Sequence, residues 1–424
     1  MIQENQIKNK RNIILITILF FISMMFHKHL MFVEGITTSE IFLIIFFLLS
    51  IYYSLSYNNF VFSRLSAVIL LILIYHNLLF FFNHTNFNFN DVQFFKSLLK
   101  LFFYTIGFLL IMNLILRIDK IMFAEIIYKL IYYYCLISIV ILAFQYLKLY
   151  FKIPIPLDYI WFGLGEEPGK FGTINSSWSI GGLPIYRNRA LQLEPSFFGI
   201  MINVLFFTVL KIRKKNYFKD SKFYIIIFAL FNTFSLTVYS FTLFNFILLV
   251  ITLKKRSEIK VKPLYISVLI LLIVATLPLT SNVVLTRINS ILDNRDRSVL
   301  KRFNFGVDAV HYNLKKSNLK GVSLGNNNLY TNLSQGTAAN KKYFIYRSSK
   351  QEYLVEYNIN FGVIFLYILS TSGILGFLLF ILKFYYLRNF SAKILLFLIC
   401  MASGSYLDSM FWTSLAAIYF VENV

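Results

Sequence analysis

The chain has 424 residues, of which 58% are hydrophobic and 14% charged, and its formal net charge is +22. Apolar runs close to twenty residues long recur from end to end, which excludes a soluble enzyme and predicts an all-α polytopic integral membrane protein. Cys135 and Cys400 both lie inside such runs, so the sequence indicates neither a disulfide framework nor a cysteine-based metal site.

Taken in chain order, the apolar runs predict about twelve transmembrane helices, with the basic N-terminus and the C-terminus on the cytoplasmic side. The predicted spans are 12–30, 40–57, 64–82, 98–116, 130–150, 194–210, 223–238, 240–253, 264–280, 358–382, 392–406 and 409–422. The whole chain, 1–424, is therefore predicted to form one polytopic membrane domain.

Two short basic loops support this orientation. The loop 211–222 has six Lys and Arg against one Asp, and 254–262 has five against one Glu. Short cytoplasmic loops carry such an excess of positive charge. Both loops fall on the cytoplasmic side only if the apolar run 223–253 is divided into two short spans, and the polar stretch "NTFSLTVYS" predicts a break there.

Two large loops, 151–192 and 281–357, are predicted on the extracytoplasmic side. The second has twelve Lys and Arg against five Asp and Glu, a net charge of +7. Loops longer than about 60 residues escape the rule on basic loops, so this charge does not reverse the orientation. The positive charge of this loop is compatible with an anionic partner, such as a lipid pyrophosphate or an acidic glycan. It is equally compatible with a solvated basic face beside anionic headgroups.

The stretch "RNRALQLEPSFFG" (187–199) ends the first large loop. Pro195 is expected in the first turn of the next helix, where its missing N–H has no intrahelical partner. Glu194 then stands at the helix start, where the helix dipole favours a carboxylate and capping is the plainer role. Arg187 and Arg189, two residues apart, share one side of an extended segment and could hold pyrophosphate oxygens or anchor at headgroups.

In the second large loop, Phe303, Val307, Val310 and Leu314 recur at helical spacing. This pattern predicts an amphipathic helix lying on the membrane, with Arg302 and two lysines facing outward and a glycine-containing turn, "GVSLGN", after it. Farther on, Glu352 and Glu356 would share one helix face if the return helix began there. Their simpler interpretation is a solvated helix start, and the alternative is an acid/base pair.

Several catalytic signatures are absent from the sequence, including GxSxG, HExxH, the Walker A motif and a DxD-type carboxylate pair. His311 is interpreted as a surface histidine of the amphipathic helix. The sequence therefore predicts neither a metal site nor a cofactor.

Together these features resemble the O-antigen polymerase family (Wzy), which belongs to the same superfamily as the O-antigen ligases. Members show an arginine, a small residue three positions on, and Glu-Pro-Ser leading into a span, as in Arg187, Ala190 and 194–196. A second, weaker match is Arg302 followed by "GVSLGN" and a return helix beginning "FGVIF". The chain departs from the pattern where alanine replaces a common glycine and where the return helix lacks a histidine found in many relatives, above all the ligases.

The resemblance implies a GT-C-like fold and a metal-independent glycosyltransferase acting on the outer face of the cytoplasmic membrane. Such an enzyme joins undecaprenyl-pyrophosphate-linked oligosaccharide repeat units into O-antigen, capsule or exopolysaccharide chains. Its partners are the lipid-linked oligosaccharides, the bilayer and a chain-length regulator protein, with no nucleic acid. Arg187, Arg189 and Arg302 are the candidates for holding pyrophosphate, and Glu194 for the catalytic base or for orienting the arginines.

Two alternatives stay open. An O-antigen ligase has the same fold and differs in its acceptor. A lipid-linked oligosaccharide flippase has a similar number of spans and the same substrate, but transporters concentrate ionisable residues within their spans, whereas here the charges cluster in the loops.

Overall fold

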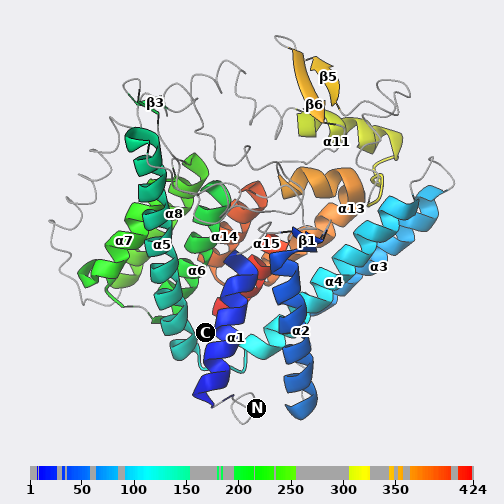
Figure 1. The fold of residues 1–424 in the computed structure, drawn as a ribbon. Coiled ribbons are helices and arrows are strands. Elements are labelled where there is room, and N and C mark those ends of the chain that lie inside the picture. The colour runs from blue at the N-terminus through cyan, green and yellow to red at the C-terminus, as the bar shows by residue number, and fades with distance from the viewer. Residues whose placement is uncertain are drawn as a thin grey trace. The chain divides into compact units, whose positions relative to one another are not determined.

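The computed structural model of the protein describes most of the apolar segments and parts of the two large loops (Figure 1). The described residues are 7, 9–25, 31–33, 36–57, 64–84, 91–152, 179–180, 183–184, 195–213, 215–233, 235–254, 305–324, 343–347, 352–356, 363–402 and 409–422. By their contacts the residues form two compact units, each of which is built from segments distant in sequence.

The first unit contains 1–59, 110–287 and 413–424. Its described helices are α1 (Lys10–Met25), α2 (Thr38–Tyr57), α5 (Lys120–Phe151), α6 (Pro195–Arg213), α7 (Ser221–Phe231) and α8 (Leu236–Lys254), with the 3-10 helix η3 (Tyr217–Lys219). The long helix α5 packs against α1, α6 and α7, and α6 packs against α8. Short hairpins β1 (Met31–Val33) with β2 (Ile36–Thr37), and β3 (Ser179–Ile180) with β4 (Leu183–Pro184), complete this unit.

The second unit contains 60–109 and 288–412. Its described elements are α3 (Arg64–His84), α11 (Phe305–Lys316), α13 (Ile364–Tyr386), α14 (Phe390–Ala402), and the hairpin of β5 (Tyr343–Arg347) and β6 (Glu352–Glu356). α13 is central, because α3, α11 and α14 all pack against it. Helices α4 (Asp91–Ile115) and α15 (Ser409–Glu422) contribute residues to both units.

Four of these helices are long and apolar enough to cross a membrane by length and composition, namely the spans Phe94–Ile115, Lys120–Leu147, Ser196–Arg213 and Ile364–Tyr386. The described part of the chain is thus mainly helical and has the composition of a membrane protein. Of the twelve predicted spans, eleven overlap a helix, and 264–280 lies outside the described residues. The number of spans and the two large loops stay predictions.

The break within 223–253 is present and has a local cause. α7 ends at Phe231 and α8 begins at Leu236. Asn232 donates its side-chain N–H to the Phe228 carbonyl at 2.8 Å, and the Thr233 hydroxyl donates to the Leu230 carbonyl at 2.7 Å. These polar side chains satisfy carbonyls that the end of a helix leaves without intrahelical partners.

The interpretation in which Glu352 and Glu356 share a helix face is wrong. Glu352 and Glu356 do not begin a helix: they bound strand β6, which pairs with β5 in the register Arg347 opposite Glu352 and Tyr343 opposite Glu356. The return helix α13 therefore starts only at Ile364.

The predicted amphipathic helix is present as α11, and its last two lysines, Lys315 and Lys316, are exposed as expected. Its buried face differs from the predicted one, because Val307 is 51% exposed while Ala309 and Asn313 are fully buried. The reason is that α11 packs on α13 through a face that includes a polar residue, which hydrophobic spacing cannot indicate.

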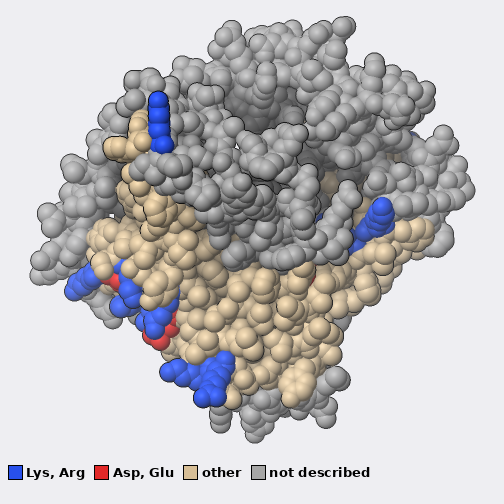
Figure 2. Space-filling model, viewed as in Figure 1, with Lys and Arg blue, Asp and Glu red and all other residues tan. Residues whose placement is uncertain are grey.

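Several basic residues of the first unit lie at one end of its helices, whereas Lys148 and Lys152 lie at the other end of α5. Lys10 and Arg11 begin α1, Lys120 begins α5, and Lys211 and Arg213 lie in the last turn of α6. Figure 2 shows Lys and Arg clustered where α1 begins, with few acidic residues among them. The backbone of Ile7 also pairs with that of Arg117, which ties the N-terminal segment to the start of α5.

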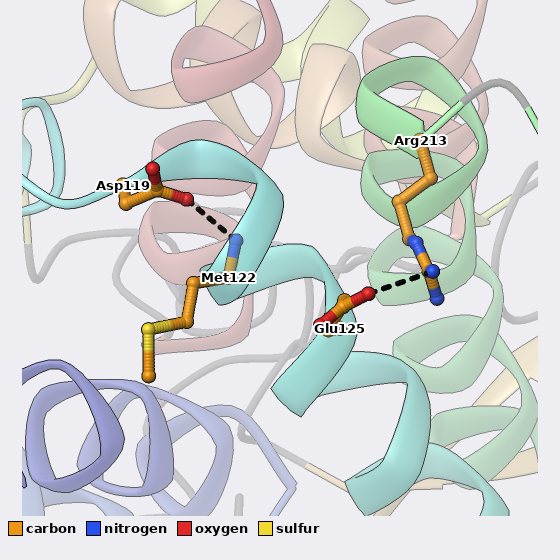
Figure 3. A network of polar contacts seen from close by, with 4 residues as sticks. All are labelled: Asp119, Met122, Glu125 and Arg213. Carbon is orange, nitrogen blue, oxygen red and sulfur yellow. Dashed lines mark hydrogen bonds and ion pairs between the residues drawn. The ribbon is translucent and has the colours of Figure 1, made fainter. Parts of the chain in front are cut away.

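Two local contacts fix helix ends at this basic end (Figure 3). Asp119 caps α5 by accepting the Met122 N–H at 2.7 Å. One turn later, Glu125 pairs with Arg213 of α6 at 2.8 Å. Because α5 begins and α6 ends here, the two helices are antiparallel, and the start of α6 at Pro195 lies at the opposite end.

Candidate functional site

The four residues that the sequence singled out, Arg187, Arg189, Glu194 and Arg302, all lie outside the described residues. The helices that follow them are described. α6 begins at Pro195, directly after Glu194, so the prediction of proline in the first helical turn is confirmed. α11 begins at Phe305, three residues after Arg302.

α6 is anchored by close packing and by polar contacts to α8. A Cβ atom on Gly199 would lie 2.4 Å from the methyl carbons of Val238, so glycine lets the two helices approach closely. Deeper along α6, Asn203 donates to the Thr242 hydroxyl at 3.1 Å, and Asn245 donates to the Asn203 side-chain oxygen at 3.0 Å. These buried contacts hold the helix that Glu194 precedes in a fixed orientation within its unit.

The most unusual described geometry lies in the second unit, where α13 is interrupted. Gly373 has φ 63° and ψ −166°, a conformation open in practice only to glycine. The segment after α11 meets this point: a Cβ on Gly321, whose φ is +85°, would lie 2.3 Å from the Gly373 nitrogen. Three non-glycine residues nearby, Asn318, Leu319 and Ser323, also have positive φ.

The backbone of the segment after α11 replaces the hydrogen bonds that α13 loses at the interruption. The Val322 N–H donates to the Ser370 carbonyl at 2.9 Å, and the Ser323 N–H donates to the Thr371 carbonyl at 2.8 Å. In return the Leu319 carbonyl accepts the Ile374 N–H at 3.1 Å. Non-helical backbone within an apolar helix is tolerated where such partners satisfy it.

Side chains from three elements complete this cluster, which we call the α13 break (Tyr75, His76, Asn313, Gly321–Ser323 and Ser370–Gly373). The Tyr75 hydroxyl of α3 donates to the Ser372 carbonyl at 2.8 Å, and His76 Nε2 lies 3.2 Å from Ser372 Oγ. From α11, Asn313 donates its side-chain N–H to Ser370 Oγ at 2.7 Å. His76, Asn313, Ser370 and Ser372 are all buried.

A second ionisable group lies farther along α13. Lys383 is 1% exposed, and its Nζ is 4.6 Å from the ring centre of Phe380, 4.7 Å from that of Trp412 and 5.4 Å from that of Phe411. Among the described residues no carboxylate pairs with it, so the aromatic faces are its electrostatic partners. The sequence placed Lys383 just beyond a span, whereas the helix continues to Tyr386.

The α13 break was not predicted from the sequence. Two signals for it exist: the run "STSG" (370–373) interrupts an apolar stretch, and His76 is an ionisable residue inside a predicted span. Chemically, the break offers hydroxyl, amide, imidazole and backbone carbonyl groups. Within the described part of the chain, no three His, Cys, Asp or Glu residues gather as a transition-metal site would require.

By fold, the described chain belongs to the class of mainly helical proteins with several apolar helices of membrane-spanning length. No family model matches the sequence, and neither a curated protein nor a solved structure matches it.

Proposed function

We propose that this protein is a polysaccharide polymerase of the cytoplasmic membrane. It joins undecaprenyl-pyrophosphate-linked oligosaccharide repeat units on the outer face, without a metal or another cofactor. In this proposal Arg187, Arg189 and Arg302 hold pyrophosphate, and Glu194 acts as base or orients the arginines. The donor is already activated by pyrophosphate, so the chemistry needs cations for the leaving group and a base for the acceptor hydroxyl.

One observation carries the proposal: the placement of the start of α6. Glu194 immediately precedes this helix, whose other end joins the basic ends of α1 and α5. Basic loops mark the cytoplasmic side of a membrane protein. We infer that the start of α6 is extracytoplasmic, on the side where a polymerase would meet its lipid-linked repeat unit. The contacts of Gly199 and Asn203 with α8 hold that helix in place.

The test is a complementation experiment in a strain that lacks the gene, with surface glycan separated by length. Arg187→Ala, Arg302→Ala and Glu194→Gln are each expected to leave the protein in the membrane but to give glycan with one repeat unit. Arg213→Gln is the matched control, because this arginine lies at the opposite end of α6, and it should restore full-length glycan. Full-length glycan from all three site variants would refute the proposal.

A flippase for lipid-linked oligosaccharides is the second candidate, and the structure contains two features in its favour. Transporters often contain interrupted helices and buried ionisable residues, and α13 has both the break at Gly373 and the buried Lys383. The same null strain distinguishes the functions. Lipid-linked repeat units accumulating on the inner face identify a flippase, and single repeats on the final acceptor identify a polymerase.

A ligase gives a third pattern in that strain. Long glycan would remain on undecaprenyl pyrophosphate, because chain growth would proceed while transfer to the final acceptor would not. The three outcomes are exclusive, so one extraction of lipid-linked and surface glycan assigns the class.

A further inference from the structure

The α13 break brings together oxygen atoms that belong to different elements. Ser370 and Thr371 present their carbonyls at the point where α13 is interrupted, and each accepts one N–H from the segment after α11. A carbonyl oxygen has two lone pairs, so each retains capacity for a further ligand. In membrane proteins, carbonyls freed by an interrupted helix are a recurrent means of coordinating cations.

Two side-chain oxygens at the same place lack a hydrogen-bond partner among the described residues. They are Asn313 Oδ1 and Ser323 Oγ, and both residues are 0% exposed. Each is tied to the break, because Asn313 donates to Ser370 Oγ at 2.7 Å and the Ser323 N–H donates to the Thr371 carbonyl at 2.8 Å. Burying a polar atom without a partner is destabilising, so such atoms in a native protein call for an explanation.

The backbone strain is concentrated here as well. Asn318, Leu319, Gly321 and Ser323 have φ between 48° and 85°, so three non-glycine residues adopt a left-handed conformation within six positions. Each such residue costs energy that the surrounding structure must offset. In this conformation the Ser323 N–H donates to the Thr371 carbonyl, which places Ser323 at the break.

The chemistry of these groups selects the ligand. Asn313, Ser323, Ser370 and Thr371 are uncharged and offer hydroxyl, amide and carbonyl oxygens, the hard donors that alkali and alkaline-earth cations prefer. Divalent cations are held by carboxylates, and none of these four residues supplies one. Asn313 and Ser323 are both 0% exposed, so a ligand held by them would be enclosed by protein.

We propose that the α13 break binds an alkali metal cation, with Asn313 Oδ1, Ser323 Oγ and the carbonyls of Ser370 and Thr371 as its candidate ligands. The cation joins the segment after α11 to α13, and so orders the C-terminal end of α11. The site stands on residues that the proposed function does not use, and it is independent of whether the protein polymerises, ligates or transports glycan.

The experiment uses the purified full-length protein in detergent at constant ionic strength, with choline chloride replaced stepwise by NaCl or KCl. The unfolding temperature is expected to rise in a saturable manner in one of the alkali salts. At ten times the half-saturating concentration the rise should be about 3 °C, and choline should give none. Asn313→Ala and Ser323→Ala should each abolish this rise.

Asn245→Ala is the matched control. Asn245 is also a buried asparagine whose Oδ1 lacks a partner among the described residues, but it lies on the uninterrupted helix α8. This variant should lower the unfolding temperature in every salt and retain the full alkali-dependent rise. Loss of the rise in Asn245→Ala as well would place the effect elsewhere and overturn the assignment.

Direct binding keeps the proposal testable if the alanine variants fail to fold. Wild-type protein should saturably retain radiolabelled Na⁺ or K⁺, whichever cation stabilises it, and an excess of the unlabelled chloride of that cation, but not of choline chloride, should displace it. Equal unfolding temperatures in the three salts, together with no saturable retention, would mean that the break holds water only, and would overturn the proposal. Neither measurement involves glycan, so failure here and failure of the polymerase assay are separate results.

Discussion

The two units of the protein handle buried polar groups in different ways. In the first unit, α6 and α8 are regular helices that meet at Gly199, and their Asn and Thr side chains bond to one another across the contact. In the second unit, α13 itself is broken at Gly373, and the backbone of another segment replaces its lost hydrogen bonds. The first arrangement joins helices; the second releases backbone carbonyls that can hold a ligand.

One charged contact from each unit shows a second difference, although the first unit also buries Arg117. The first unit pairs Arg213 with Glu125 at the basic end of its helices, with partly exposed side chains. The second unit buries Lys383 among aromatic rings. Burying a charge is costly, and buried ionisable residues in apolar helices are most often retained for function. Ligand binding is therefore best tested in the second unit, and helix anchoring in the first.

The largest effect is expected from Gly373→Ala. The added Cβ would lie 2.2 Å from the Leu319 carbonyl oxygen, and the φ of 63° with ψ of −166° disfavours any side chain. We expect a loss of about 3 kcal/mol or more in unfolding free energy, measured by denaturant or thermal unfolding in detergent. If Gly373→Ala lowered the unfolding free energy by less than Gly199→Ala does, the backbone at the break would be able to rearrange around a side chain.

Gly199→Ala should have a smaller effect, because the clash is with a side chain on a regular helix. Its Cβ would meet the Val238 methyl groups at 2.4 Å, and overpacking of this kind costs about 1–3 kcal/mol. The double variant Gly199→Ala, Val238→Ala should recover part of that loss, which a double-mutant cycle measures. If the two losses are simply additive, α6 and α8 are not in contact at this point.

Lys383→Met tests whether the buried lysine is kept for stability. Because methionine fills a similar volume without a charge to desolvate, we expect the unfolding free energy to be unchanged or higher by about 1 kcal/mol. Lys383→Ala should be less stable, since it leaves a cavity beside Trp412. A methionine variant as unstable as the alanine one would show that the cation–π contacts dominate.

The smallest effect is expected at the Arg213 and Glu125 pair. The two side chains are 20% and 46% exposed, and exposed ion pairs contribute less than about 1 kcal/mol. A double-mutant cycle with Arg213→Gln and Glu125→Gln should give a coupling energy in this range that decreases as salt is added. A larger, salt-independent value would show that this pair, too, is effectively buried.

Most helices could be predicted from the amino-acid sequence, because long apolar runs in a membrane protein have few alternatives to helix. It also placed Pro195 in the first turn of α6 and the break between α7 and α8, since both depend on local backbone chemistry. The roles of Arg187, Arg189, Glu194 and Arg302 rest on resemblance and stay predictions.

Three features could not be predicted from hydrophobic spacing: the α13 break, the strand at Glu352–Glu356 and the buried face of α11. The break and the buried face of α11 each depend on a partner distant in sequence: the Gly321 backbone packs against Gly373, and Asn313 is buried where it contacts Ser370. Strand β6 instead pairs with the neighbouring strand β5. Hydrophobic spacing reports which residues avoid water, but not which polar groups satisfy one another inside the fold. For that physical reason the cluster around Gly373 became visible only in three dimensions.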